Sequence, residues 1–157
     1  MRPQSGFTLI ELVITVTIVG ILASAIVPLG QLNVKRIKEA ELRTALRDIR
    51  GALDAYKKAV DEGRVEKTAD ATGYPPSLAV LVNGVPDAKD PKKNPIRFLR
   101  RIPRDPMYPD AEARADETWG KRSYESDPEA PREGNDIYDV YSVSRENGLN
   151  GIPYREW

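Results

Sequence analysis

The sequence of 157 residues contains no histidine and no cysteine. These absences remove the commonest general base, the thiol nucleophile, zinc sites built from such residues and any disulfide framework. Lys plus Arg and Asp plus Glu both number 24, so no excess of positive charge indicates a nucleic-acid partner, and none is expected. A glycine-rich phosphate-binding motif and internal repeats are also missing from the sequence. The sequence therefore argues against an enzyme and predicts one small domain.

A long apolar segment near the start of the chain is the most informative feature that is present. Residues 7–29 contain one charged residue, Glu11, and as a helix of about 34 Å they would span a hydrocarbon core of roughly 30 Å. We therefore expect a transmembrane helix over 7–29, preceded by a short leader, 1–6. Gly20 and Pro28 mark its weakest part, because proline removes a backbone donor. A carboxylate in such a segment costs at least ~2.5 kcal/mol unless it is paired or neutralised, so Glu11 needs a partner.

The apolar pattern becomes amphipathic after residue 30. We expect one helix from about Phe7 to Glu62, in which residues 30–62 form an amphipathic continuation that Gly63 ends. On its exposed side, Glu39 and Arg43 have the i,i+4 spacing of a helical ion pair. Apolar residues at spacings of 4, 3, 4, 3 and 4 predict a stripe that packs under a small domain, with a zipper against a partner helix as the alternative: Leu42, Leu46, Ile49, Leu53, Tyr56 and Val60.

The remaining residues, 63–157, predict a small globular domain, and the fold class is α+β. Ser77 is a candidate N-cap for a short helix. Alternation of apolar and polar residues predicts two short antiparallel strands late in the chain. In order, the expected parts are the helix over 77–83, a surface loop over 86–118 anchored by Phe98, Leu99 and Ile102, strands over 121–126 and 138–144, and a tail docked through Tyr154 and Trp157.

The segment Gly6-Phe7-Thr8-Leu9-Ile10-Glu11, followed by about twenty apolar residues, resembles the type IV pilin and pseudopilin superfamily. The resemblance implies cleavage between Gly6 and Phe7 by a prepilin peptidase, N-methylation of Phe7 and assembly into a helical filament. In such a filament the Phe7 amine of one subunit can neutralise Glu11 of another. The alternative is an interfacial Glu11 that snorkels to the membrane surface or stays protonated near the helix N-terminus.

The same resemblance implies where the chain is located. It places the leader in the cytoplasm, a single-pass helix in the inner membrane and the C-terminal domain in the periplasm. The basic residues Lys35, Arg36 and Lys38 would by themselves favour the opposite orientation. We give the resemblance more weight than this count of basic residues, and we expect the C-terminal domain in the periplasm.

Later segments look like the major pseudopilin of type II secretion, and the absence of a C-terminal cysteine pair also favours a pseudopilin over a pilin. The resemblance implies a homopolymeric periplasmic filament that drives protein export, with the peptidase, an inner-membrane assembly platform, minor pseudopilins and, before assembly, the membrane as partners. A type IV pilus for adhesion or motility is the alternative. The matching segments are Gly73-Tyr74-Pro75-Pro76-Ser77-Leu78, Arg101-Ile102-Pro103-Arg104-Asp105-Pro106, Trp119-Gly120, Tyr138-Asp139-Val140-Tyr141-Ser142 and Trp157.

A membrane-anchored enzyme or ligand-binding module is the remote alternative. Its best candidate acids, Asp105, Asp136 and Asp139, lie beside turns or a strand, where acids usually cap the backbone or face solvent.

No cofactor is required by these interpretations, but the resemblance implies calcium in the loop after the last strand. The loop over 142–151 departs from the family pattern, because Asn147-Gly148 replaces an Asp-Gly step and residues 152–156 lack the later paired aspartates. The candidate ligands Glu146, Asn147 and Asn150 supply one carboxylate. Calcium usually takes six to eight oxygen ligands. The alternative to a calcium site is a loop closed by its Asn-Gly turns and by the docking of the C-terminal aromatic residues.

Overall fold

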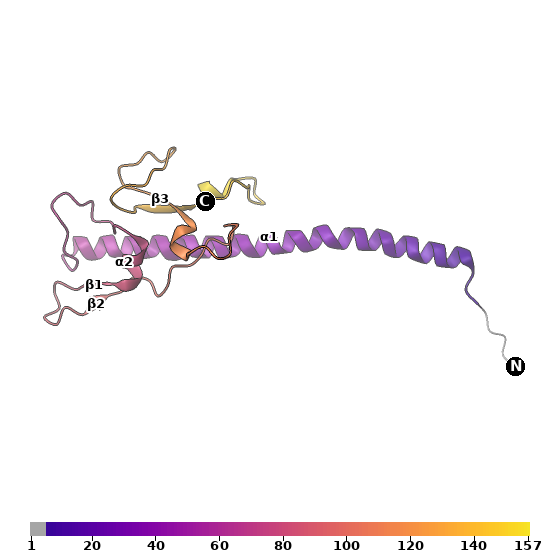
Figure 1. Ribbon diagram of the computed structural model, residues 1–157, viewed down its shortest axis with the longest axis horizontal. Helices are drawn as coiled ribbons and strands as arrows, with labels where there is room; N and C mark the ends of the chain where they lie inside the picture. The colour runs from indigo at the N-terminus through magenta and orange to yellow at the C-terminus, as the bar shows by residue number, and fades with distance from the viewer. Residues whose placement is uncertain (1–5) are drawn as a thin grey trace. The chain divides into compact units, whose positions relative to one another are not determined.

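The computed structural model describes residues 6–157, with the side chains of 25–30 left out of that description. Residues 1–37 and 38–157 form two compact units, and each is described by itself. The long helix α1 (Leu9–Asp61) belongs to both of them (Figure 1). It begins two residues later and ends one residue earlier than the sequence predicts. Gly63, in the left-handed region at φ +69°, follows its end, as expected for a residue that stops a helix.

The backbone of α1 is helical through Gly20 and through position 28. The side chain of Pro28 lies outside the described residues, so the weakness predicted there stays a prediction. Among the residues whose side chains are described, no helix is both long and apolar enough to cross a membrane. The span predicted over 7–29 includes residues 25–29, whose side chains lie outside that description.

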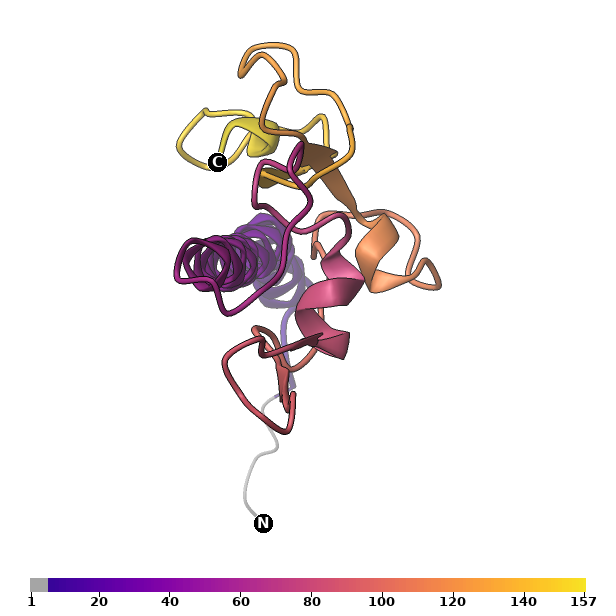
Figure 2. The same ribbon diagram turned by 90° about the vertical axis from the view of Figure 1, so that its left-hand side faces the viewer.

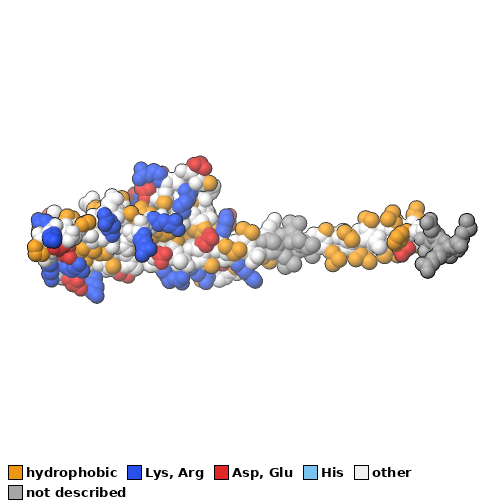
Figure 3. Space-filling view, turned by 90° about the horizontal axis from the view of Figure 1, so that it is seen from below, with side chains coloured by type: hydrophobic (Ala, Val, Ile, Leu, Met, Phe, Trp, Pro, Cys, Tyr) orange, Lys and Arg blue, Asp and Glu red, His pale blue; other side chains and the backbone are white. Residues whose placement is uncertain are grey.

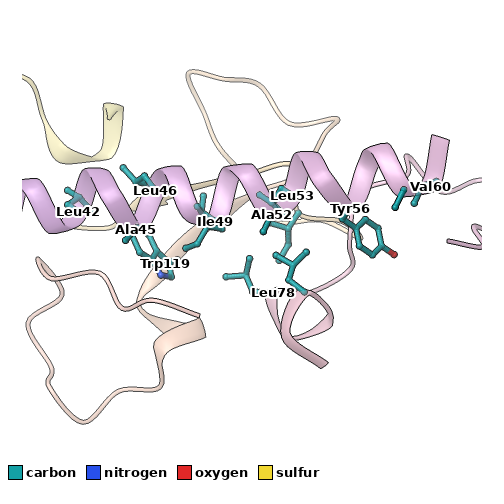
Figure 4. Close-up of a cluster of buried hydrophobic side chains, with 14 of the residues drawn as sticks. Leu42, Ala45, Leu46, Ile49, Ala52, Leu53, Tyr56, Val60, Leu78 and Trp119 are labelled. Atoms are coloured by element: carbon teal, nitrogen blue, oxygen red, sulfur yellow. The ribbon is translucent and has the colours of Figure 1, made fainter. Parts of the chain in front are cut away.

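The apolar stripe of α1 forms one wall of the core, as Figure 4 shows, and all six of its residues are buried. The cover comes from three later elements: α2 (Leu78–Asn83), β3 (Trp119–Arg122) and β4 (Asp139–Ser142). Burial of this apolar surface stabilises the packing of these elements, and of the loops between them, against α1. The residues that complete the core include Leu78, Leu81, Trp119, Ile137, Val140 and Tyr154. This arrangement confirms the core-packing interpretation of the stripe.

Ile49→Ala is expected to lower the free energy of unfolding by about 2–5 kcal/mol, because Ile49 is 0% exposed and its loss leaves a cavity. Thermal unfolding of the full chain in detergent measures the change. Gly51→Ala is the matched control on the same helix, since a methyl group there meets no atom within 4 Å. That control should be neutral or slightly stabilising. Equal stability of Ile49→Ala and the unchanged chain would contradict the predicted core.

The two predicted strands pair antiparallel, as expected, but they are shorter and β3 starts earlier than predicted. Trp119 of β3 lies opposite Ser142 of β4. The surface loop contains a small hairpin that the sequence did not predict, formed by β1 (Val85–Pro86) and β2 (Pro95–Ile96). Two single-turn 3₁₀ helices, η1 (Ala115–Glu117) and η2 (Tyr154–Glu156), were also not predicted. The predicted loop anchors do pack against the core. The α+β class is confirmed.

The start of α2 differs from the prediction in one respect. Ser77 occupies the N-cap position in an extended conformation, but its side chain makes no capping hydrogen bond. The helix is instead positioned by the burial of Leu78 and Leu81. Its end is as predicted, with Gly84 at φ +86° following Asn83.

Candidate processing and assembly site

The segment that carries the processing motif lies just ahead of α1. Residues 6–8 have no regular secondary structure, and Thr8 occupies the N-cap position at the start of α1. The backbone amide of Glu11 donates to Thr8 Oγ1 at 3.3 Å, and the amide of Leu12 donates to the Thr8 carbonyl at 3.2 Å. Glu11 is therefore the third residue of the helix, where the macrodipole favours a negative charge.

Gly6 and Phe7 are both exposed on this short segment without regular secondary structure. Phe7 is 84% exposed. A Cβ built at Gly6 has no atom within 4 Å, so the fold of the chain itself leaves room for a side chain at that position. Any strict need for glycine there must come from another molecule that holds this segment.

The first turns of α1 present apolar side chains all round. Every described residue from Leu9 to Ser24 is exposed, and Figure 3 shows hydrophobic side chains along this part of the helix. The hydroxyl groups among them donate back to carbonyls one turn earlier: Thr15 to Leu12, Thr17 to Val13 and Ser24 to Ile21, at 2.7–2.9 Å. A helix that is apolar on every side needs lipid or other helices around it. Within this described stretch, Glu11 is the one charged side chain.

A second group of polar contacts fixes the C-terminal loop to α1. Glu39 is only 7% exposed, and its Oε1 accepts hydrogen bonds from the Leu149 amide at 2.7 Å and the Tyr154 hydroxyl at 3.0 Å. Burial raises the pKa of the Tyr154 hydroxyl, and the neighbouring Glu39 raises it further. The predicted exposed ion pair between Glu39 and Arg43 is thus wrong, because the loop covers Glu39.

The predicted docking of the tail is confirmed. Tyr154 is 0% exposed, and its ring meets that of Trp157 edge to face at a centroid distance of 5.0 Å. The Gly148 amide donates to the Ile152 carbonyl at 2.9 Å. A Cβ at Gly148 would lie 2.4 Å from the Trp157 ring, so only glycine fits there. Turns and aromatic packing together close the loop.

The three residues considered for calcium lie in the C-terminal loop, and the structure shows contacts within this loop for two of them. Asn150 Oδ1 accepts the Ile152 amide at 3.1 Å, and Asn147 takes part in a backbone bridge with Pro153. Glu146 is then the one carboxylate among the three candidates. Within the described part of the chain, no group of three or more His, Cys, Asp or Glu residues is arranged to hold a metal ion. The three candidate side chains supply one carboxylate, whereas calcium usually takes six to eight oxygen ligands.

Glu39→Ala is expected to lower the free energy of unfolding by about 2–4 kcal/mol, because it leaves the Tyr154 hydroxyl and the Leu149 amide without their acceptor. Glu39→Gln keeps an oxygen acceptor and should cost less. Tyr154→Phe removes one of the two bonds and should fall between the unchanged chain and Glu39→Ala. Urea unfolding of the full chain gives these values. An unchanged midpoint for Glu39→Ala would show that the loop does not depend on this carboxylate.

The acids considered for an enzyme are each held by structural partners. Asp105 is buried, where it accepts the Ser142 hydroxyl at 2.6 Å and the Met107 amide at 2.8 Å, and burial raises the pKa of its carboxyl group. Asp136 accepts the Tyr124 amide and the Thr72 hydroxyl. Asp139 pairs with Arg50 at 2.8 Å. Asp105 caps the Met107 amide, as expected for an acid beside a turn, but it is buried, which the sequence did not predict.

The sequence analysis missed one residue of these sites, Thr8, and the role of another, Glu39, as a buried acceptor. Thr8 could have been found, because Thr-x-x-Glu directly before an apolar run is the signature of a capping box. Glu39 could not, because its spacing to Arg43 is that of an ordinary surface ion pair and its acceptor role depends on a loop 110 residues away.

Comparison with known proteins bears on both ends of the chain. The prokaryotic N-terminal methylation motif matches residues 1–27. The type II secretion system core protein G of Dickeya chrysanthemi is 32% identical over 160 residues, covering 96% of this chain and 96% of that protein. The proteins of the same name from Klebsiella pneumoniae, 28% identical over 93% of this chain and 100% of the relative, and Aeromonas hydrophila, 33% identical over 67% of this chain and 68% of the relative, are also similar. No match was found among solved structures.

Proposed function

Because this chain belongs to the family of the type II secretion system core protein G, we propose that it is cleaved before Phe7 and assembles through pairing of the new amine with Glu11. The chain is a major pseudopilin, the subunit that forms the pseudopilus of type II secretion, and is a structural protein and not an enzyme. Cleavage, methylation and pairing are the steps that the proposal adds.

One observation carries the assembly step. The first part of α1 is exposed and apolar on all sides, its hydroxyl groups are satisfied within the helix, and Glu11 is its one charged group among the residues described. Removal of residues 1–6 would create an amine four positions before Glu11. In a bundle of such helices, a carboxylate and an amine from different subunits neutralise each other in a medium of low dielectric. A register that left either of them unpaired would be disfavoured, so the pair selects one axial stagger.

The location and partners follow from the same proposal. Before assembly the apolar part of α1 lies in the inner membrane, with residues 63–157 in the periplasm, and after assembly the filament stands in the periplasm. A prepilin peptidase recognises the leader 1–6. The mature subunit then interacts with an inner-membrane assembly platform and with minor pseudopilins as the filament forms.

The proposed subunit needs no bound metal ion in its C-terminal loop. Glu39 accepts hydrogen bonds from Leu149 and Tyr154 and so holds the loop against α1, and the candidate calcium ligands supply only one carboxylate. A chelator added to the full chain should therefore leave the unfolding midpoint unchanged. A large drop that added calcium reverses would contradict this part of the proposal.

Within an assembled filament, residues 20–28 are expected to be the part of α1 that bends or melts most easily. Pro28 lacks an amide donor, and Gly20 lowers helix propensity by about 1 kcal/mol relative to alanine. An electron cryomicroscopy map of the filament would show this as weak or non-helical density. Unbroken helical density through these residues would rule out melting there.

Reconstitution with a type II secretion machinery tests the proposed function. The full chain is expressed in cells that lack their own core protein G, and filaments and export of a folded substrate are both measured. The expected result is restored export together with short filaments that shearing releases. Long surface filaments without export would instead support the type IV pilus alternative.

A further inference from the structure

A basic groove runs beside α1 next to the C-terminal tail. Its volume is about 330 Å³, and its lining includes Arg43, Leu46, Arg47, Arg50, Ile152 and Trp157. Leu46 is buried beneath the groove and Ile152 is 45% exposed, and these two residues make its floor apolar. The arginines of the lining make its rim cationic. Glu156 also lines the groove, with its carboxylate 3.9 Å from Arg155.

Two of the three arginines have no carboxylate partner among the residues that the structure describes. The third, Arg50, already has partners within the chain: it pairs with Asp139 at 2.8 Å and donates to the Trp157 carbonyl at 2.9 Å. The Arg43 guanidinium lies over the Trp157 ring, 4.3 Å from its centroid. Arg47 is exposed and donates to the Thr44 hydroxyl at 3.2 Å. The groove therefore offers two cations over an apolar floor.

An acidic loop with the opposite character lies elsewhere on the same domain. We define it as residues 125–133, with the sequence ESDPEAPRE, four acids against one arginine. Glu125, Asp127, Glu129 and Glu133 are all exposed, and none of them forms an ion pair within the described part of the chain.

The acidic loop is ordered by its own hydrogen bonds. The Glu129 amide donates to Asp127 Oδ1 at 2.9 Å, and the Arg132 amide donates to the Ser126 hydroxyl at 2.8 Å. Two prolines, Pro128 and Pro131, restrict the backbone further. Figure 2 shows the loop extending away from the other segments of this domain. A surface that is already ordered loses little conformational entropy when it docks.

The groove and the acidic loop lie at different levels along α1. The base of the loop lines a second hollow together with Tyr56 and Val60, whereas the groove lies along residues 43–50. The difference is about 15–20 Å at ~1.5 Å of rise per residue. Because the base of the loop is displaced from the groove along α1, a contact between these two surfaces fits two copies that are displaced along the helix axis. Such a contact uses different patches on the two copies, and heterologous contacts that do not close into a ring build helical filaments.

We infer that the acidic loop of one subunit docks in the basic groove of a second copy of this chain, displaced along α1 in the filament. The inference rests on the proposed filament function and adds the surface that joins the domains. Complementary charge at such a contact sets specificity and register more than affinity. The Phe7–Glu11 pair and this contact would each fix an axial displacement between subunits, at two separate points along α1.

Cysteine crosslinking tests the contact directly, because the natural chain has no cysteine to interfere. The full chain carrying Arg47→Cys and Glu129→Cys together is assembled with the secretion components and oxidised. A ladder of covalent multimers is expected on a non-reducing gel. Each single variant should give monomer only, and a mixture of the two single variants should give dimers and nothing larger. Filaments that form normally without a ladder would overturn the inference.

Charge reversal gives an independent test with a matched control. Arg43→Glu with Arg47→Glu, or Glu125→Arg with Glu129→Arg, should each lower filament yield about tenfold, because like charges then face each other. The four changes together should restore most of the yield. Arg100→Glu with Arg101→Glu makes the same charge change at two exposed residues outside both surfaces and should have little effect.

The outcomes separate this contact from the proposed function. Equal losses from the arginine pair and from the control pair, or no recovery in the combined variant, would contradict the contact while the filament itself stands. No filaments from the unchanged chain in the same cells would remove the proposed function and, with it, this inference.

Discussion

Glu11→Ala is expected to abolish filament assembly while membrane insertion, cleavage after Gly6 and the fold of residues 63–157 persist. Alanine makes the isolated helix more favourable in lipid, so a loss must arise when subunits associate. An unpaired charge in a buried environment costs about 3–5 kcal/mol, which corresponds to a loss of at least roughly 100-fold in assembly. Sheared filaments and export of a folded substrate are the two measurements.

Two further variants separate charge pairing from helix capping. Glu11→Gln removes the charge but keeps a side chain that suits the third position of a capping box. It should therefore impair assembly if pairing is the role of Glu11, and should have little effect if capping is. Thr8→Ala removes the observed cap on the Glu11 amide while keeping both charges, so it is expected to assemble. Normal filaments and export from Glu11→Ala would end the pairing mechanism.

Gly6→Val is expected to trap the chain as a precursor that retains residues 1–6. No atom of the chain lies within 4 Å of a Cβ built at Gly6, so valine would not clash with the chain itself. The restriction is expected from the peptidase, whose site must enclose the residue before the cut bond. Mass spectrometry of the membrane fraction should show a mature chain starting at methylated Phe7 for the natural sequence and a chain starting at Met1 for the variant.

Gly20→Ala is the matched control for this processing experiment. Gly20 also has no atom within 4 Å of a built Cβ, but it lies inside α1 and away from the cut. It should be cleaved and methylated normally. A mature, methylated product from Gly6→Val would show that the peptidase does not require glycine, and an uncleaved natural chain would contradict processing altogether.

The sequence alone was enough for the parts of this protein that depend on local order. The 4-3-4-3-4 spacing predicted which side of α1 would be buried, because helical geometry repeats every 3.6 residues whatever packs against it. Gly63 predicted the helix end, because glycine tolerates the positive φ needed there. The processing motif could be located in the same way, since Gly6, Phe7 and Glu11 act through their order along one short segment.

The tertiary structure decided what depends on residues distant in sequence. Glu39 was predicted as an exposed partner of Arg43, but the folded C-terminal loop turns it into a buried acceptor. Asp105 is likewise buried, and it accepts a hydrogen bond from Ser142, which is 37 residues away in the sequence. The hairpin of β1 and β2 has just two residues in each strand, too few for a periodic pattern to reveal. The basic groove also exists only in three dimensions, because α1 and the C-terminal tail must meet to form it. Spacing along the chain determines the face of a helix, whereas burial and partners at long range are set by packing.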